Sequence, residues 1–280
     1  MTLQQCLQIG EAKLRGGPQP DRARRDAELL LMHVARLERA ALLARRDEGL
    51  SAATAVRFLA LVARRLAGEP VQYIVGETEF YGLPFKVTRD VLIPRPETEH
   101  LVEKVLELAG RFKQPRMVDV GAGSGAIAVA LAHQLPQAQI TAIDLSAEAL
   151  AVSQDNAKRN GVAVRFLRGD LLSPVAAERF EIVVSNPPYV PTADRAELAV
   201  EVRDYEPGLA LFAGEDGLDV YRRLIPEACG VLVPGGFLAL EIGFGQSAEI
   251  AELLSGSGFE QIEFVPDLQG IARVACARRR

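Results

Sequence analysis

Beyond Arg116 the sequence alternates between short apolar runs rich in β-branched residues and longer segments with apolar residues three and four apart. Short apolar runs bounded by turn residues predict buried strands, whereas the longer spacing predicts helices. Strands are expected at 117–120, 139–143, 164–167, 182–185, 236–242, 259–265 and 272–277, and helices at 126–134, 147–160, 217–228 and 246–255. This alternation is typical of the α/β class, in which helices cover both faces of a mostly parallel sheet.

Two other patterns precede this region. Residues 1–66 are rich in Leu, Ala and Arg at helical spacing, which predicts a small bundle of helices. Residues 71–91 hold β-branched and aromatic residues between glycine-containing turns, which predicts a connecting β-hairpin. A further helix is expected from Glu97 to Leu108. The sequence therefore predicts a helical domain at 1–70, a hairpin linker at 71–92 and an α/β domain at 93–280.

Composition and charge limit the classes of protein to which the chain can belong. With 280 residues and 49% hydrophobic content, the chain can bury a large core. The net charge is −5, with 12 Lys and Arg against 8 Asp and Glu in residues 1–70, and 20 against 29 in the rest. The acidic character of residues 71–280 disfavours a protein whose main function is non-specific DNA binding. A partner that contains RNA remains compatible with the mildly basic N-terminal part.

The three cysteines and three histidines are scattered, without the spacing of a disulfide framework or a metal site. The first residues lack a basic stretch followed by an apolar stretch, and no apolar run approaches the ~20 residues that cross a bilayer. We therefore expect a cytoplasmic protein that holds no metal, and we separately expect it to act as a monomer. It should contact neither a membrane nor DNA directly.

A glycine-rich turn, Asp119–Ala126, follows the first strand of the α/β region and opens a helix. Its glycines let the backbone approach a ligand closely. Asp144 ends the next strand, where a carboxylate can accept both hydroxyls of a ribose, so we expect a nucleotide-type cofactor. The turn also satisfies the dinucleotide pattern G-x-G-x-x-G/A, and alone it does not choose the cofactor. The cofactor-binding residues expected in the turn are Gly121, Ala122, Gly123, Ser124 and Gly125.

The rest of the region resembles the S-adenosylmethionine-dependent methyltransferases. Asp119 precedes the first glycine, and Gly169-Asp170-Leu171 follows the third strand. In that family the loop after the third strand receives adenine, which implies that Asp170 meets the adenine amino group and Leu171 packs on its ring. The resemblance also implies a Rossmann-like sheet of seven strands with the last one antiparallel. For a nicotinamide enzyme, neither a suitable His nor a Tyr-x-x-x-Lys arrangement is visible.

The tetrapeptide Asn186-Pro187-Pro188-Tyr189 comes directly after the strand expected at 182–185. Asn-Pro commonly starts a turn, but in α/β proteins ligands bind at the carboxyl ends of strands. The Asn186 side-chain oxygen and the Pro187 carbonyl can accept the two N–H groups of a planar nitrogen and aim its lone pair at a methyl donor. The hydrogen bonds from the N–H groups to these two oxygens strengthen as positive charge develops on the nitrogen, so no strong base is obligatory. The two prolines stiffen the acceptors, Tyr189 can stack on the acceptor group, and Asn186 is also expected to border the cofactor.

This tetrapeptide is similar to the hallmark of adenine-specific DNA methyltransferases and of protein-glutamine methyltransferases, and its chemistry does not choose between them. The segments 68–74, 79–83 and 91–99 closely resemble the release factor glutamine methyltransferases, the HemK/PrmC family. Further similarities lie at Glu206-Pro207, Ala210-Leu211, 214–218, 240–243 with Gln246, and Asp267-Leu268-x-Gly270-x-x-Arg273. The resemblance covers about residues 68–276, and in residues 1–66 only the helical character is similar.

The resemblance implies transfer of a methyl group from S-adenosyl-L-methionine, leaving S-adenosyl-L-homocysteine. The acceptor would be the glutamine amide of the Gly-Gly-Gln motif in class I peptide chain release factors, in support of translation termination. The tetrapeptide 186–189 would hold this glutamine, and the helical domain at 1–70 would recognise the substrate. Some members of the family carry an aromatic residue at the position of Leu171.

Two other functions stay open at this point. One is an adenine amino-methyltransferase that acts on DNA or RNA, which would need room for a flipped base. The other is a translation-associated binding protein that keeps the cofactor fold without turnover. Arg95 and Glu97, in the segment 91–99, are expected either to line the entrance of the pocket or to form a surface ion pair.

Overall fold

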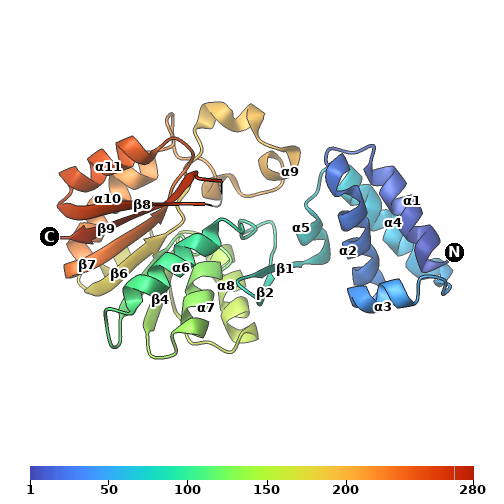
Figure 1. Ribbon diagram of the computed structural model, residues 1–280, viewed down its shortest axis with the longest axis horizontal. Coiled ribbons are helices and arrows are strands. Elements are labelled where there is room, and N and C mark those ends of the chain that lie inside the picture. The colour runs from blue at the N-terminus through green and yellow to red at the C-terminus, as the bar shows by residue number, and fades with distance from the viewer. Residues whose placement is uncertain (268) are drawn as a thin grey trace. The chain divides into compact units, whose positions relative to one another are not determined.

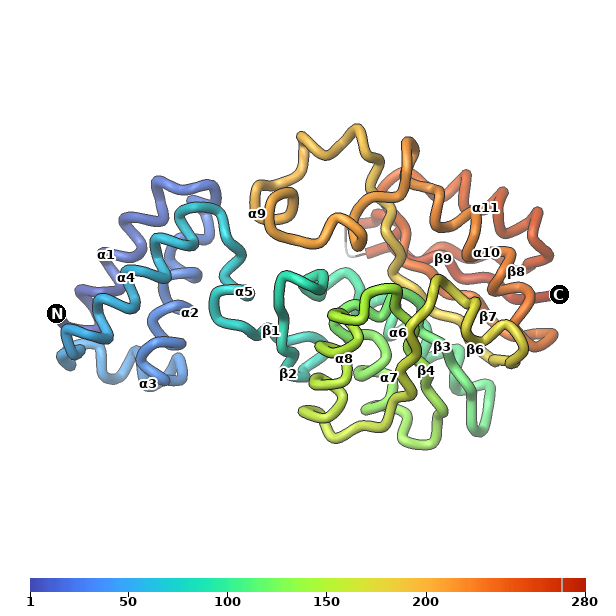
Figure 2. The backbone as a smooth tube through the Cα atoms, turned by 180° about the vertical axis from the view of Figure 1, so that it is seen from behind, coloured from blue at the N-terminus to red at the C-terminus, as the bar shows by residue number. Residues whose placement is uncertain are grey.

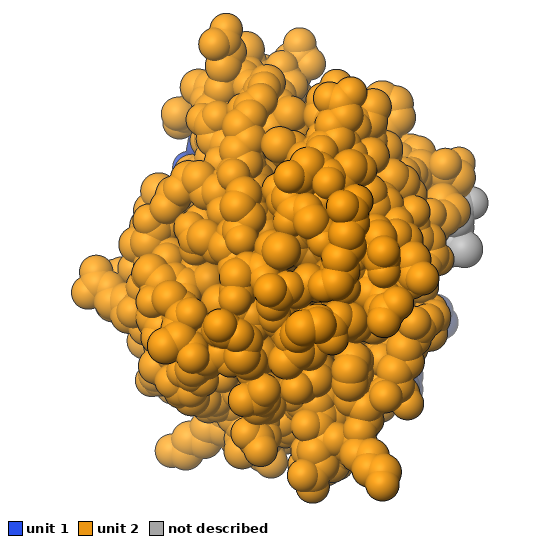
Figure 3. Space-filling model, turned by 90° about the vertical axis from the view of Figure 1, so that its left-hand side faces the viewer, with its two compact units in different colours: residues 1–77, 198–205 blue, residues 78–197, 206–280 orange. Residues whose placement is uncertain are grey.

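The computed structural model describes residues 1–267 and 269–280, so Leu268 of the Asp267–Arg273 segment lies outside the described residues. The chain divides into two units. The smaller unit contains residues 1–77 and 198–205, and the larger unit contains residues 78–197 and 206–280. Figure 3 draws the larger unit in orange. The segment 198–205 therefore belongs to the helical unit, although 120 residues of the larger unit, 78–197, precede it in the chain.

A seven-stranded sheet forms the centre of the larger unit (Figure 1). Its strands follow the order β5-β4-β3-β6-β7-β9-β8. Neighbouring strands from β5 to β7 pair in parallel, and β9 is antiparallel to both β7 and β8. The expected Rossmann-like sheet with an antiparallel last strand is thus confirmed. The strands are β3 (Arg116–Val120), β4 (Gln139–Asp144), β5 (Arg165–Arg168), β6 (Phe180–Ser185), β7 (Leu232–Glu241), β8 (Phe259–Pro266) and β9 (Ala272–Arg279).

Helices cover both faces of this sheet (Figure 1). Alternate strand residues face opposite layers: Ile182 and Val184 of β6 pack with one set of helices, and Val183 packs with the other. On the first face lie α6 (Thr98–Ala109), α7 (Ala126–Gln134) and α8 (Ala147–Arg159), and on the second lie α10 (Asp219–Val231) and α11 (Ser247–Gly256). Short 3₁₀ turns occur at Ser173–Val175, Thr192–Glu197 and Gly208–Ala210.

A short hairpin of β1 (Glu77–Phe80) and β2 (Leu83–Lys86) precedes the sheet, and β2 lies alongside α8 (Figure 2). The hairpin is shorter than the expected one at 71–91, because Val71–Val75 forms a helix, α5. Pro70 precedes this helix, and Gly76 ends it in the left-handed conformation. Val71 and Ile74, three residues apart, pack into the helical core, so their β-branched character does not decide the local structure.

In the smaller unit, the helices of residues 1–77 pack around one apolar core. Thr2 and Gln5 begin the first helix with a reciprocal capping box. The helices of this unit are α1 (Leu3–Leu14), α2 (Ala23–Ala35), α3 (Arg39–Ala44), α4 (Ala52–Leu66), α5 and α9 (Val200–Arg203), with a 3₁₀ turn at Pro20–Arg22. Among residues 1–267 and 269–280, no helix has the length and apolar character needed to span a membrane.

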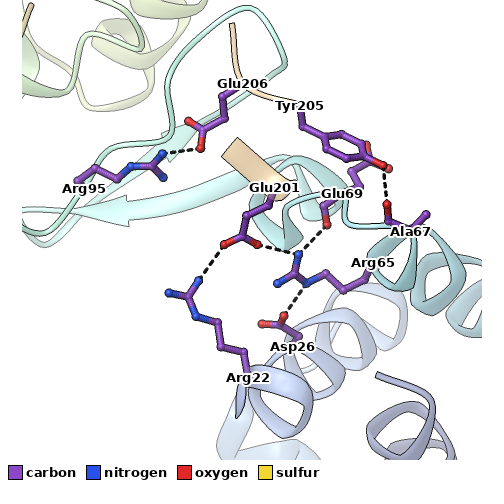
Figure 4. Close-up of polar contacts among 9 residues, drawn as sticks. All are labelled: Arg22, Asp26, Arg65, Ala67, Glu69, Arg95, Glu201, Tyr205 and Glu206. Atoms are coloured by element: carbon purple, nitrogen blue, oxygen red, sulfur yellow. Dashed lines mark hydrogen bonds and ion pairs between the residues drawn. The ribbon is translucent and has the colours of Figure 1, made fainter. Parts of the chain in front are cut away.

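A buried arginine joins the segment 198–205 to the other helices of the smaller unit (Figure 4). Arg65 Nε lies 2.6 Å from Asp26 Oδ2, and Arg65 Nη1 lies 2.8 Å from Glu201 Oε2. The same Nη1 donates to the Glu69 carbonyl at 3.1 Å. The Tyr205 hydroxyl donates to the Ala67 carbonyl at 3.0 Å. The loop that follows the Asn-Pro-Pro-Tyr segment thus supplies a polar component of the helical unit.

Candidate active site

The glycine-rich turn joins β3 to α7 and is held by the end of β4. The N–H groups of Gly121 and Ala122 both donate to the Ile143 carbonyl, at 2.9 and 3.0 Å. A Cβ added at Gly121 would meet no heavy atom within 4 Å, because this part of the turn borders open space. Gly125 is different: its φ is +80°, and an added Cβ would lie 3.1 Å from the Cβ of Ser153 in α8. The turn therefore leaves room for a ligand at Gly121 and allows close helix packing at Gly125.

Asp144 is oriented by two main-chain donors. Its Oδ2 accepts the Gly123 N–H at 2.8 Å, and its Oδ1 accepts the Ser146 N–H at 2.9 Å. Each carboxylate oxygen keeps a further lone pair, so Asp144 can still accept two hydroxyl groups. This arrangement suits the diol of a ribose.

A cavity of about 520 Å³ lies entirely within the larger unit. Its volume falls in the range that binds small cofactors. Of the site residues expected from the sequence, those that line it are Gly121, Ala122, Gly123, Ser124, Asp144, Asp170, Leu171, Asn186 and Pro188. Gly125, Pro187 and Tyr189 are outside the lining. The turn, the acidic residue at the end of β4 and the first residue after β6 are therefore brought to one cavity.

Asp119 lies beneath the turn rather than in the cavity. Its carboxylate is fully buried, and Oδ2 accepts the Ala128 N–H at 3.1 Å. Within the part of the chain that the structure describes, Oδ1 has no hydrogen-bond partner. Burial, with a smaller contribution from the charge of Asp144, raises the pKa of Asp119 to about 7.

The loop after β5 borders the same cavity. Gly169 N–H donates to the Asp144 carbonyl at 3.0 Å, which brings the two loops together. The Asp170 carboxylate pairs with Arg223 of α10, with Oδ2 and Nη2 2.5 Å apart, and its other oxygen is available to a ligand. Leu171 has a φ of 48° and packs partly on the second core. Asp170 and Leu171, in the loop where the family resemblance puts adenine, therefore line the cavity together with Arg223.

The Asn-Pro-Pro-Tyr segment begins where β6 ends. Asn186 Nδ2 donates to Thr98 Oγ1 at 3.1 Å, and Thr98 Oγ1 donates to Glu241 Oε2 at 2.6 Å. Asn186 Oδ1 makes no hydrogen bond within residues 1–267 and 269–280. Asn186 lines the cavity, so its side chain offers an acceptor to a ligand there.

Tyr189 lies against the end of β7. Its hydroxyl is 3.4 Å from Glu241 Oε1, and its carbonyl accepts Gln246 Nε2 at 3.2 Å. A Cβ added at Gly243 would lie 3.1 Å from the Tyr189 ring, so the absence of a side chain there makes room for it. Burial, followed by the charge of Glu241, raises the pKa of Tyr189, so its hydroxyl stays protonated at neutral pH.

Thr98 and Glu241 are polar residues of the site that sequence reasoning missed. Glu241 is the last residue of β7 and Thr98 the first of α6. Burial raises the pKa of Glu241 to about 7, against the lowering effect of the hydrogen bonds from Thr98 and Tyr189. A glutamate at the end of an otherwise apolar strand was the signal in the sequence that could have identified it.

Arg95 lines the cavity and forms an ion pair with Glu206, whose side chain is only 1% exposed (Figure 4). Glu206 Oε2 also accepts the Ile93 N–H at 3.1 Å. Of the two roles expected for Arg95, the structure favours the pocket lining, with Glu206 rather than Glu97 as its partner. Glu97 precedes α6 and is not among the lining residues.

The chain is similar to known proteins both in its N-terminal helices and in its α/β region. The chain matches the Methyltransferase small domain over residues 97–202 and the PrmC N-terminal domain over residues 5–76. It is 46% identical to the release factor glutamine methyltransferase of Moorella thermoacetica, over 100% of this chain and 99% of that protein. The proteins of the same name from Koribacter versatilis and Deinococcus radiodurans are 43% and 44% identical, also over 100% of this chain and 99% of each relative.

Solved structures are similar in fold. A methyltransferase from Pyrococcus furiosus has a TM-score of 0.51 and 18% identity, over 71% of this chain and 90% of that one. A T. thermophilus 16S rRNA methyltransferase in complex with AdoMet and guanosine has a TM-score of 0.56 and 20% identity, over 73% and 50%. The methyltransferase family model and the curated relatives define the chain as an S-adenosylmethionine-dependent methyltransferase, and its fold agrees with that class. Within that class, the chain belongs to the release factor glutamine methyltransferase family.

Proposed function

We propose that this protein transfers a methyl group to the side-chain amide nitrogen of a glutamine in a peptide chain release factor. The observation that carries the proposal is the Asn186 amide, which lines the cavity with its oxygen free, in a chain whose relatives bear this activity in their names. We further propose that this glutamine belongs to the Gly-Gly-Gln motif of class I release factors. Such a substrate implies that the enzyme acts in the cytoplasm.

The residues of the cavity fit S-adenosylmethionine. When bound, this cofactor supplies an electrophilic methyl group on a sulfonium. Asp144 would accept the two ribose hydroxyls through the lone pairs that Gly123 and Ser146 leave free. The open space at Gly121 would admit the ligand close to the backbone, and Asp170 with Leu171 would border the adenine.

Asn186 and Pro187 would orient the glutamine amide. The Asn186 oxygen and the Pro187 carbonyl accept its two N–H groups, so that the nitrogen lone pair points along the line of transfer. As the new N–C bond forms, the bond from the methyl group to the sulfonium sulfur would break with its electron pair left on sulfur, and the nitrogen would become positive and then lose one proton to water. Acceptors aimed at the N–H groups favour this charge, and no strong base is required. Pro188 limits the freedom of this loop, and Tyr189 supports it from the side of β7.

The helical unit would recognise the folded release factor. Its match to the PrmC N-terminal domain and its excess of basic residues in 1–70 support this role. A release factor and a short Gly-Gly-Gln peptide should then differ strongly in KM while sharing a similar chemical step. Equal KM values for protein and peptide would count against recognition by the helical unit.

The proposed function is tested with cofactor carrying a labelled methyl group. Purified enzyme should label a class I release factor at its Gly-Gly-Gln glutamine, as mapped by mass spectrometry, and should not label the same factor with Ala in place of that glutamine. Duplex DNA and RNA serve as the competing substrates. Label on adenine, or cofactor binding without any turnover, would overturn the proposal in favour of the two alternatives.

A further inference from the structure

Asn186 and Glu241 occupy adjacent positions at the carboxyl ends of two paired strands. Ser185 of β6 is in register with Leu240 of β7, so the next residues of the two strands are Asn186 and Glu241. Val184 of β6 and Ala239 of β7 both face the core beneath α6, and residues two positions further on face the same way. Both side chains therefore meet the first residue of α6, Thr98.

The three side chains form one chain of hydrogen bonds with a defined direction. An ionised carboxylate only accepts, so Glu241 takes the single hydroxyl proton of Thr98. The Thr98 oxygen can then only accept from Asn186, and it takes the Nδ2 proton at 3.1 Å. This bond fixes Nδ2 on Thr98 and leaves Oδ1 to accept from a ligand in the cavity that Asn186 lines, as the proposed reaction needs.

We propose that Thr98 and Glu241 are positioning residues that hold the Asn186 amide with its oxygen toward the substrate, and that protonation of Glu241 releases this orientation. This inference rests on the proposed function, because it concerns the acceptor for the glutamine N–H groups. Thr98 lines the cavity and Glu241 is not among the lining residues, and we assign neither of them a contact with the reacting atoms. Their effect passes through the orientation of Asn186.

Protonation reverses the chain of hydrogen bonds. A neutral Glu241 can donate to Thr98, whose hydroxyl is then free to donate toward Asn186. That donor favours the flipped amide, which turns Oδ1 to Thr98 and presents Nδ2 to the cavity. Two N–H groups of a substrate amide would then face a donor instead of an acceptor.

The surroundings of Glu241 place this change near neutral pH. Burial is the largest influence and raises its pKa to about 7, and the charge of Glu97, just before α6, acts in the same direction. Arg273 of β9 and the hydrogen bonds from Thr98 and Tyr189 oppose that increase. The Tyr221 hydroxyl of α10 donates to the Glu241 carbonyl at 2.7 Å and holds the main chain there.

The first test compares Thr98→Val with Thr98→Ser. Thr98→Val keeps the shape but removes the hydroxyl, so kcat should fall by roughly 10- to 100-fold with little change in cofactor Kd, and Thr98→Ser should restore most of the activity. Thr141→Val removes another buried hydroxyl, in β4 outside the cavity lining, and should leave kcat unchanged. Equal losses in Thr98→Val and Thr98→Ser, or a parallel loss of cofactor affinity, would overturn the inference.

The second test follows kcat with pH. Wild-type kcat should fall as pH decreases through about 7, and Glu241→Gln, which cannot ionise, should lose this acidic decline. A decline that persists unchanged in Glu241→Gln would refute the role of Glu241.

A measurement without substrate separates this inference from the proposed function. The Asn186 side-chain N–H₂ signals, identified in ¹⁵N NMR spectra by their loss in Asn186→Ala, should be protected from exchange in wild type and lose protection in Thr98→Val. If the wild type fails to methylate a release factor, the proposed function fails, and the NMR result alone decides whether the amide is held. Signals that are identical in both proteins would contradict the positioning role.

Discussion

Replacing Arg65 with Met should destabilise the helical unit strongly. Arg65 is 3% exposed and pairs with two carboxylates, Asp26 at 4% and Glu201 at 15% side-chain exposure. Methionine fills a similar volume but offers no charge and no donor. The substitution leaves one carboxylate buried without its partner, removes the support of a second, and withdraws the donor from the Glu69 carbonyl.

Breaking a buried pair from one side reduces the free energy of unfolding by about 3–5 kcal/mol, because the remaining charge stays buried and uncompensated. A small domain has a total stability of about 5–15 kcal/mol, so this loss is at least about a fifth of it. With a urea dependence of about 1–3 kcal/mol per molar, the unfolding midpoint of the helical unit should fall by at least ~1 M.

Hydrogen exchange of the full chain in increasing urea separates the two units, because peptides from α2 and α4 report on the helical unit and peptides from β3 and β6 report on the sheet. Arg45→Met is the matched control: Arg45 pairs with Glu48 at the surface, and its loss should leave the midpoint unchanged. In a double-mutant cycle, adding Asp26→Asn to Arg65→Met should recover part of the lost stability. If Arg65→Met shifts the midpoint no more than Arg45→Met does, the reasoning from buried charge is wrong.

Other perturbations test the proposed site and its support. Asn186→Ala should lower kcat by roughly 100-fold or more while cofactor Kd stays nearly unchanged, measured by calorimetry and single-turnover assays; an equal loss in both would contradict its role as acceptor. Asp144→Ala should weaken cofactor binding first, seen as a higher Kd in the same titration, and an unchanged Kd would remove Asp144 from the cofactor site. The folded-state pKa of Asp119 is raised to about 7 from 3.8, so its contribution favours folding at low pH and is lost as pH rises from about 4 to about 7. Asp119→Asn should therefore gain stability relative to wild type across that window, by on the order of 4 kcal/mol at most, and urea unfolding at a series of pH values that shows no such trend would refute it. Gly125→Ala should cost about 1–2 kcal/mol in the same unfolding assay because of its positive φ and the nearby Ser153, and a neutral result would show that the turn relaxes easily.

The regular elements of the larger unit are readable from the sequence because apolar spacing and turn residues agree there. The helix at 126–134 and the strands around Asp119 and Asp144 lie where the pattern puts them. The helix at 71–75 was missed, because its β-branched residues favour a strand locally while tertiary packing favours a helix.

The polar residues that support the candidate site could not be predicted from the local sequence either. Thr98 and Glu241 are 143 residues apart in sequence, and only the strand order brings them together. The same is true of Arg65 and Glu201, which meet because a loop of the α/β region returns to the helical unit. Long-range contacts of this kind leave no periodic trace in the sequence.

The discontinuous helical unit has a practical consequence for exchanging domains between relatives. A domain fused at one end of a chain could be replaced by cutting at a single junction. Here the chain passes between the two units at three places, after residues 77, 197 and 205. A chimaera that replaces residues 1–77 alone would present a foreign surface to the native segment at 198–205, with Glu201 and Tyr205 facing residues that did not evolve with them. Substrate preference should therefore be transplanted with both segments together, and the short second one is the piece that a boundary drawn from sequence would leave behind.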